Sequence, residues 1–395
     1  MIGTTCCNLF SEAFLNEILF SLLWMTYTIL VTGGAGLIGS HIVDHLLKEG
    51  HTVKILDALD KPTHLYGKPS YIPQEAQFFH GDTRDEKLVT HALADVDIVF
   101  HQAAKGGIHA AASDYISTNS FATAQLFEII HKHKFPVKKV ITASSVAVYG
   151  EGLYICPTHG KIHPQNRTVE QLEKGHWEVS CPLCLTLLVP QQTPEETPVN
   201  PETPYSLSIY DQEKITILSG KKYGIPVAAL RYFLTYGPRQ SLTNPYTGLC
   251  SIFSTQILNN KNPTVYEDGK QTRDFIFVED VAAANLFVMH NKKAEGVFNV
   301  GTGVPTTIAT FARTLCDLYN KPVSPNITAE FRPGDTRHIV ADIHKLEQLG
   351  FTPKHTLKAG LKKYLDWIAL QNNVQDYFSA MHQELTKTSI IRQKI

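Results

Sequence analysis

The chain has 395 residues, of which 43% are apolar, so it is long enough to bury a substantial core in a globular fold. Its 36 basic and 37 acidic residues nearly cancel and are spread along the chain. This balance excludes the basic footprint of a nucleic-acid-binding or membrane-surface protein, so we expect a small-molecule partner, no nucleic acid and no membrane.

The first 24 residues are apolar, but they lack the features of a targeting segment. The run has no basic N-terminal region, is interrupted by Glu12 and Glu17, and leads directly into a strand after Met25. We interpret residues 1–24 as an N-terminal extension. The seven cysteines, an odd number, do not suggest a disulfide framework, and we therefore expect a cytoplasmic protein.

A strand, a glycine turn, a helix and a second strand follow in "YTILVTGGAGLIGSHIVDHLLKEG" and "TVKILDA". Gly33, Gly36 and Gly39 allow a tight turn, close approach of a pyrophosphate to the backbone, and close packing of the helix on the strand. Asp57 ends the second strand, where its carboxylate can accept hydrogen bonds from both ribose hydroxyls and would repel a 2′-phosphate. This unit predicts an NAD site that disfavours NADP.

Buried strands continue to alternate with helices in "VDIVFHQAA", "VKKVITASS" and "VAALRYF". We therefore predict an α/β fold with a doubly wound parallel sheet, the Rossmann architecture, over residues 25–232. Ligands of such sheets bind beyond the carboxyl ends of the strands. That rule predicts one crevice lined by residues that follow successive strands: Asp82, Ala103, Ala104, Ser144 and Ser145.

A cysteine-rich insert spans residues 152–201. Four of its residues have the chemistry and spacing of zinc ligands: Cys156, His159, Cys181 and Cys184. They form two pairs of x₂ spacing separated by 21 residues, which is typical of tetrahedral zinc and, with no open position, of a structural site. His163 and His176 are reserve ligands. The proline-rich, acidic stretch "LVPQQTPEETPVNPETP" is predicted to be a tether.

The part from residue 233 to 372 is expected to form a smaller substrate-binding lobe, interleaved with the sheet. Two of its stretches, "PTTIATFARTLCDLY" and "LKAGLKKYLDWIAL", have the apolar spacing of amphipathic helices. Residues 373–395 are mixed and polar, and we assign them nothing beyond a helix or tail.

The order of these motifs resembles that of the extended short-chain dehydrogenases/reductases, specifically the NAD-dependent nucleotide-sugar epimerase/dehydratase family. The segments that carry the resemblance include "TGGAGLIGS", "GDTRD", "SSVAVYG", "PYSLS", "TRDFIFVEDV" and "RPGDTR". Within the family, "SLTNPYTGLCSIFSTQI" and the cysteine-rich insert resemble the dTDP-L-rhamnose 4-epimerase branch. The resemblance implies 4-epimerisation of a nucleotide sugar through a transient 4-keto sugar, and a homodimer.

The resemblance also implies roles for individual residues. Tyr205 matches the acid/base tyrosine, and Ser145 matches the serine that hydrogen-bonds the sugar hydroxyl or ketone. Three residues match positions on the nucleotide side of the substrate: Arg273, Arg332 and Asp335. Asn119 matches the structural asparagine near the active site and is grouped with the substrate-side residues. An ordinary salt bridge between Arg273 and Asp274 is the alternative for that pair.

Two positions depart from the family pattern. Ile209 replaces the lysine that holds the nicotinamide ribose and lowers the pKa of the tyrosine, and Leu234 replaces an asparagine that contacts the substrate. A free tyrosine has a pKa of about 10, so only about one phenol in a thousand is ionised near neutral pH.

No other lysine is an obvious substitute. Lys214, nine residues after Tyr205, faces the other side of the helix at about 100° per residue. Lys105 borders the cofactor crevice and is the better stand-in, with a solvated loop lysine as the alternative. Three functions therefore stay open: a working 4-epimerase, a weak or inactive homologue that binds NAD or a nucleotide sugar, and a related dehydratase or reductase.

Overall fold

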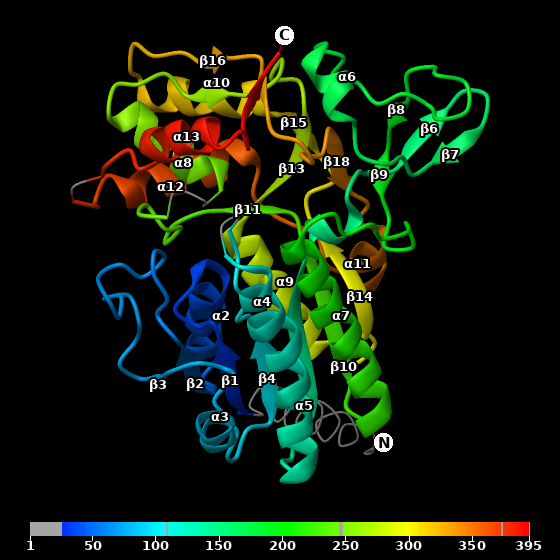
Figure 1. Ribbon diagram of the computed structural model, residues 1–395. Helices are drawn as coiled ribbons and strands as arrows, with labels where there is room; N and C mark the ends of the chain where they lie inside the picture. Colours follow the sequence, from blue (N-terminus) through cyan, green and yellow to red (C-terminus); the bar gives the residue numbers. More distant parts are fainter. Residues whose placement is uncertain (1–25, 108–109, 245–247, 373, 395) are drawn as a thin grey trace, which may run out of the picture.

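The computed structural model describes residues 26–107, 110–244, 248–372 and 374–394. It arranges them as a sheet domain, a smaller lobe next to the carboxyl ends of the strands, and an insert beside the lobe (Figure 1). The N-terminal extension of residues 1–24 lies outside the described residues. Within the described ranges, no helix combines the length and the apolar character that crossing a bilayer requires.

A seven-stranded parallel sheet forms the centre of the larger part. The strand order is β14-β10-β5-β4-β1-β2-β3, so the chain starts in the middle and reverses direction between β1 and β4. The strands are β1 (Thr28–Thr32), β2 (Thr52–Asp57), β3 (Gln77–His80), β4 (Ile98–His101), β5 (Lys139–Ser145), β10 (Val227–Tyr232) and β14 (Gly296–Val300). This order confirms the predicted doubly wound sheet.

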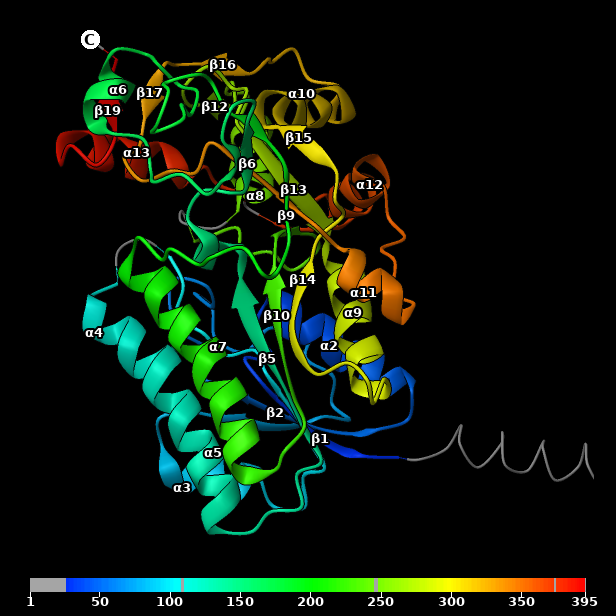
Figure 2. The same cartoon turned by 90° about the vertical axis from the view of Figure 1, so that its right-hand side faces the viewer.

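Helices cover both faces of this sheet, with α5 and α7 together on one side (Figure 2). That side carries α3 (Glu86–Ala92), α4 (Ala112–Tyr115), the π-helical segment η1 (Ile116–Phe121), α5 (Ala122–Lys132) and α7 (Pro204–Tyr223). The other side carries α2 (Leu37–Lys48), α9 (Val278–His290) and α11 (His344–Leu349). Alternate residues of β1 enter the two cores, Ile29 and Val31 on the α2 side and Leu30 on the α5 side, because side chains alternate along a strand.

The lobe is built around a second, smaller sheet. Its strands are β11 (Leu234–Tyr236), β13 (Thr272–Phe277), β18 (His338–Ala341), β9 (Gln192–Thr193) and β15 (Pro305–Thr307), with the short pairs β12 (Thr264–Val265) with β16 (Asn326–Ile327) and β17 (Glu330–Phe331) with β19 (Arg392–Gln393). Its helices are α8 (Leu249–Leu258), α10 (Ile308–Tyr319), α12 (Leu357–Ile368) and α13 (Phe378–Lys387). The two predicted amphipathic helices are α10 and α12, and their buried faces share one aromatic-rich core with α8 and β13.

The insert contains a three-stranded antiparallel sheet and one short helix. These elements are β6 (Tyr154–Cys156), β7 (Gly160–Ile162), β8 (Val189–Pro190) and α6 (Val169–Glu173). The 3-10 turn η2 (Val146–Tyr149) leads into it from β5. The start of the predicted tether is ordered instead, because β8 pairs with β6 and β9 pairs with β18 of the lobe.

Candidate functional site

The glycine turn between β1 and α2 forms one edge of a cavity of about 170 Å³ at the carboxyl ends of the strands. Gly33 has a φ of +66°, and a Cβ on it would lie 2.7 Å from the backbone nitrogen of Ala103. A Cβ on Gly39 would collide with the Gly33 carbonyl oxygen, so both positions need glycine. Gly36 caps α2 and lines the cavity with Ala103 and Ala104, and the amides of this helix N-terminus suit a pyrophosphate.

Asp57 is held rigidly at the rim of this cavity. Its Oδ2 accepts a 2.9 Å hydrogen bond from the amide of Ala35, and its Oδ1 accepts a 2.8 Å bond from the amide of Leu59. A carboxylate has about four acceptor sites, so the two that remain can receive ribose hydroxyls. The side chain is 8% exposed and lines the cavity, as the sequence predicted for an NAD site.

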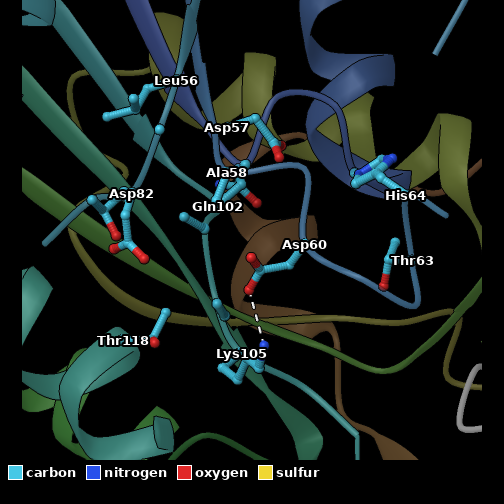
Figure 3. A pocket seen from close by; sticks show the side chains of 16 residues that line it. Leu56, Asp57, Ala58, Asp60, Thr63, His64, Asp82, Gln102, Lys105 and Thr118 are labelled. Carbon is cyan, nitrogen blue, oxygen red and sulfur yellow. Dashed lines mark hydrogen bonds and ion pairs between the residues drawn. The ribbon is translucent and has the colours of Figure 1, made fainter. Parts of the chain in front are cut away.

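Asp82, Asp60 and Lys105 of this cavity are already in ion pairs, of which Figure 3 shows the one between Asp60 and Lys105. The Arg84 guanidinium donates two bonds of 2.9 and 2.6 Å to the Asp82 carboxylate, and these bonds hold the pKa of Asp82 below its ordinary value. The Nζ atom of Lys105 lies 2.9 Å from Oδ2 of Asp60. Lys105 therefore lines the cofactor cavity as predicted, but its ammonium is engaged with Asp60.

Asn119 braces the loop that carries Lys105. The amide is fully buried in η1; its Oδ1 accepts from the Lys105 backbone nitrogen at 2.7 Å, and its Nδ2 donates to the Lys105 carbonyl at 3.1 Å and to Ser208 Oγ at 2.9 Å. Single π-helical turns often mark functional sites, and this one aims the amide inward. All three bonds go to protein, so Asn119 supports the cofactor loop and α7 and does not face a substrate cavity.

Ser145 and Tyr205 come from the end of β5 and the start of α7. Ser145 Oγ accepts a 3.1 Å bond from the Ala147 amide, and a reciprocal capping box between Thr203 and Ser206 fixes the N-terminus of α7. Burial raises the pKa of the Tyr205 phenol above its ordinary value, and hydrogen bonding with the Ser145 hydroxyl acts in the opposite direction. The phenol is therefore protonated near neutral pH in the absence of a nearby cation.

Ile209, one helical turn after Tyr205, is a core residue. Its side chain is 2% exposed. It belongs to an apolar cluster that contacts the ring of Tyr205 and whose other buried members are Val148, Tyr149, Phe233, Ile339 and Ala341. At the position of the family's lysine, α7 therefore packs an apolar side chain into the core, and it provides no cation one helical turn from Tyr205.

A buried polar network lies beneath the carboxyl end of β5, and the sequence analysis did not predict it. Ser144 was expected in the crevice, but it points inward and donates a 2.7 Å bond to Glu213. Glu213 also receives bonds of 2.9 and 2.6 Å from Arg231, which in turn donates to the Tyr149 hydroxyl at 2.8 Å. In the sequence, the only available signal was Arg231 inside the apolar strand β10, because Glu213 lies in the polar stretch "DQEK". This network ties β5, β10 and α7 together below Ser145.

A second cavity of about 300 Å³ lies in the lobe and contains Arg273, Arg332 and Asp335 in its lining. The guanidinium of Arg273 donates only to backbone carbonyls, including that of Thr336 at 2.5 Å and that of Arg337 at 3.1 Å. In the part of the chain that the structure describes, no carboxylate lies within ion-pair distance of it. Burial lowers the pKa of Arg273, and the carboxylates of Asp335, Glu151 and Glu267 act in the opposite direction without forming an ion pair with it. A half-buried cation that no carboxylate pairs with favours an anionic ligand.

Asp274 does not pair with Arg273, which excludes the salt bridge considered above. Its carboxylate is buried and accepts hydrogen bonds from the backbone of Thr302, Gly303 and Ala341. Neighbours along a strand point to opposite faces, so the two charges are separated by the sheet itself.

Arg332 differs from Arg273 because its counter-charge is present. Asp335 Oδ1 accepts bonds of 2.8 and 2.7 Å from the Arg332 guanidinium, and this carboxylate raises the pKa of Arg332. Leu234 of β11 also lines the lobe cavity, so an apolar side chain occupies the place of the expected amide.

The four predicted zinc ligands converge in the insert, with their ligand atoms all within 4.8 Å of one another. The Nδ1 atom of His159 lies 3.5 Å from the sulfurs of both Cys156 and Cys181, and the sulfurs of Cys156 and Cys184 are 3.6 Å apart. Tetrahedral bonds of about 2.3 Å to sulfur and about 2.0 Å to nitrogen require ligand separations of about 3.5 to 3.8 Å. The donor set therefore fits zinc. The reserve ligand His163 instead bonds backbone carbonyls.

A buried charge network fastens the insert to the lobe. Arg167 of the insert donates two 2.9 Å bonds to Glu267 and a 2.7 Å bond to the backbone carbonyl of Asp335. Arg337 bonds the same Glu267 at 2.8 Å and Glu178 of the insert at 2.5 Å. The insert and the loop that carries Arg332 are therefore held in one arrangement. In the sequence these charges are indistinguishable from surface residues.

The sequence profile of the NAD dependent epimerase/dehydratase family matches residues 29–170 and 188–301. The dTDP-L-rhamnose 4-epimerase of Burkholderia thailandensis is 32% identical over 349 residues, covering 86% of this chain and 94% of that protein. The UDP-glucose 4-epimerase of Thermotoga maritima, solved with UDP-glucose, is similar at a TM-score of 0.71 and 28% identity, over 87% of this chain and 98% of that one. The UDP-glucuronic acid 4-epimerase of Bacillus cereus, solved with UDP-glucuronic acid and NAD, gives 0.70 and 26%, over 87% and 99%.

Proposed function

Since the chain belongs to the NAD dependent epimerase/dehydratase family, we propose that it is an NAD-dependent nucleotide-sugar 4-epimerase. The observation that carries this proposal is the convergence of Ser145, at the carboxyl end of β5, with Tyr205, at the start of α7, on the same edge of the sheet as the glycine turn. Asp57 and the free helix amides suit NAD, and the unpaired Arg273 suits the diphosphate of the substrate.

In this mechanism, Tyr205 accepts the proton of the sugar 4-hydroxyl while the hydrogen on C4 leaves as hydride. Bound NAD supplies the reversible hydride acceptor. Ser145 donates a hydrogen bond to the oxygen that becomes the ketone, and it donates again when that oxygen regains its proton. Tyr205 would return the proton to this oxygen at the end of the cycle, and because the bound NAD would give back the hydride that it accepted, the inversion would need no net oxidation.

We assign the two recognition tasks to the two parts of the chain, residues 25–232 to NAD and residues 233–372 mainly to the nucleotide sugar. The Burkholderia relative is named for dTDP-L-rhamnose, so a dTDP-linked 6-deoxysugar is the first substrate to test, and UDP sugars are the second. Arg273 and Arg332 are proposed to hold the diphosphate, with Asp335 orienting Arg332.

The insert of residues 152–201 is proposed to hold one structural zinc ion. All four coordination positions come from the protein, so no position is open for catalysis. The insert's own core is small, with Tyr154, Val179 and Leu188 packed around two of the cysteines, so the metal would supply much of its stability.

We also propose a cytoplasmic homodimer. Exposed apolar side chains gather on the outer face of the paired helices shown in Figure 2, namely Phe121 of η1 with Leu207 and Leu218 of α7. Leu207 and Leu218 lie three helical turns apart on one face, which a second copy of the helix pair would cover. The free cysteines of the described residues suit a reducing compartment.

A homologue that binds NAD or a nucleotide sugar with little turnover is the second candidate. The burial of Ile209 favours it, because no cation from α7 lowers the raised pKa of Tyr205. A dehydratase is less well supported, because Val146 and Ala147 follow Ser145 where an acidic pair would be expected.

The test is to incubate the purified protein with NAD and a panel of dTDP and UDP sugars and to resolve the product epimers by chromatography. Epimerisation of one sugar supports the proposal. Binding of NAD and a nucleotide sugar without any product supports the second candidate.

A further inference from the structure

The C-terminal segment, residues 376–394, forms one wall of the lobe cavity. Phe378, Met381 and Leu385 of α13 are buried and line this cavity together with Arg273 and Arg332. Their spacing of three and four residues places them on one face of the helix, while Gln383, Glu384 and Lys387 on the outer side are exposed. Figure 1 shows α13 lying across α8 at this side of the lobe.

Contacts at both ends of α13 fix this face over the cavity. Lys261 pairs with Asp376 at 2.7 Å before the helix. Glu330 of β17 accepts a 3.0 Å hydrogen bond from His382, which lies within α13, and a 3.1 Å hydrogen bond from Gln393 of β19, which follows the helix. Since β19 pairs with β17, directly before Arg332, the segment is joined to the loop that carries a predicted diphosphate ligand.

The cavity lining combines two kinds of chemistry. The guanidinium groups of Arg273 and Arg332 can bind an anion, while Phe378 and Met381 pack with Tyr266 as an apolar, aromatic part of the lining whose hydroxyl group lies near Arg332. Gln271 also lines the cavity; its Nε2 donates to the Tyr266 carbonyl at 3.0 Å, and its buried Oε1 has no hydrogen-bond partner among the described residues. An unsatisfied buried acceptor beside an aromatic wall matches a planar base that carries an N–H donor.

We propose that α13 is part of the substrate site and closes the nucleoside end of the lobe cavity. Met381 and Phe378 pack against the base and sugar of a pyrimidine nucleoside diphosphate, and Gln271 accepts a hydrogen bond from the imide N–H that uracil and thymine share. This inference rests on the proposed function, because it describes how that function's substrate is held.

The experiment measures calorimetric binding of dTDP, of UDP and, separately, of NAD to the full chain and to Met381→Ala and Phe378→Ala. We expect each substitution to weaken dTDP or UDP binding by about tenfold, because it removes a buried apolar contact with the ligand. NAD affinity should stay unchanged, since neither residue lines the cofactor cavity. Glu384→Gln, on the exposed face of the same helix, is the matched control and should bind as the intact chain does.

Equal nucleotide affinity in the intact chain and in both alanine variants would overturn the role of α13. A chain ending at Gln375 provides a second test and should lose nucleotide binding while it keeps NAD binding; if it does not fold, the point variants decide. If the intact chain binds NAD but neither dTDP nor UDP, the proposed function itself is wrong. That result differs from the one that would reject only the role of α13, in which the intact chain and the alanine variants bind the nucleotides equally well.

Discussion

The two cavities of the molecule are assembled in opposite ways. The cofactor cavity is lined by residues between Gly33 and Thr118, nearly all of them at the carboxyl ends of successive strands of one parallel sheet or on the loops that follow those strands. The lobe cavity takes its lining from β11, α8, β13, the Arg332 loop and α13, which span residues 234 to 385. The first is therefore a property of a local repeating unit, whereas the second exists only when distant segments have packed.

The two cavities also differ in whether their charged side chains already have ion-pair partners. In the cofactor cavity, Asp82 and Lys105 are neutralised by Arg84 and Asp60, so backbone amides and Asp57 are left to recognise the ligand. In the lobe cavity, Arg273 forms no ion pair among the described residues, although the carboxylates of Asp335, Glu151 and Glu267 act on it at longer range. The difference indicates that the lobe cavity, rather than the cofactor cavity, offers a side-chain cation to an anionic ligand. We therefore expect most substitutions to change ligand binding in one cavity and leave it unchanged in the other.

Replacing Arg273 should have the largest effect. Arg273→Ala is expected to weaken nucleotide-sugar binding by about 100-fold, because charge-assisted hydrogen bonds to a diphosphate are lost from a partly buried site. NAD affinity should not change. Calorimetry with both ligands checks this, and Arg313→Ala, an exposed arginine on α10, is the control. A matching loss of NAD binding would mean that the two cavities are not independent.

Removing one of the proposed zinc ligands should have the second-largest effect. It should impair binding of the nucleotide sugar in the lobe and leave NAD binding unchanged. Cys181→Ser is expected to lose the metal, lower the melting temperature and raise the KM for the nucleotide sugar by about tenfold, because Arg167 of the insert holds the Arg332 loop. Metal analysis, thermal unfolding and steady-state kinetics measure these three effects. His176→Ala, an exposed residue outside the ligand cluster, should retain one zinc per chain. A zinc-free wild type would contradict the prediction.

Asp57 tests the cofactor cavity alone. Asp57→Ala should weaken NAD binding by about tenfold and reduce the preference for NAD over NADP, because the acceptor for the ribose hydroxyls and the charge that repels a 2′-phosphate both disappear. Nucleotide-sugar binding should be unaffected. Titrations of the two cofactors against the intact chain and the variant give the answer, and equal NAD and NADP affinities in the intact chain would refute the interpretation.

Ile209 lines neither cavity and lies in the apolar cluster beside Tyr205, and the smallest effect is expected there. Burial raises the pKa of Tyr205, and only the phenolate accepts the proton, so wild-type turnover should rise as the pH increases toward alkaline values. Ile209→Lys should increase turnover by roughly threefold near pH 7 and shift the pH profile downward, because an ammonium favours the phenolate.

The apolar cluster around Ile209 limits this gain, since it must accommodate an ammonium and the protein should lose melting temperature. Ile209→Met keeps the position apolar and is the control for packing. The double change Ile209→Lys with Leu234→Asn restores both family positions and is the stronger test. A pH profile that is identical in wild type and variants would show that another group controls Tyr205.

The sequence by itself determined the sheet, the glycine turn, the place of Asp57 at the end of β2, and the four residues of the Cys/His cluster in the insert. These features are set by short-range patterns: the spacing of glycines, the apolar runs of buried strands, and two Cys/His pairs. The ends of parallel strands must lie at one edge of a sheet, so residues that follow each strand could be placed together before any coordinates were known. The position of Ile209 after Tyr205 could be read in the same way.

Only the tertiary structure decided which polar residues face a ligand and which support the fold. Ser144 turns inward to Glu213, Asn119 braces a loop, and Arg167 meets Glu267 across a sequence separation of 100 residues. A charged or polar residue looks like a surface residue until its partner is known, and here the partners come from distant segments. The wall formed by Phe378, Met381 and Leu385 has the same origin, because a short amphipathic helix does not specify what its apolar face will cover.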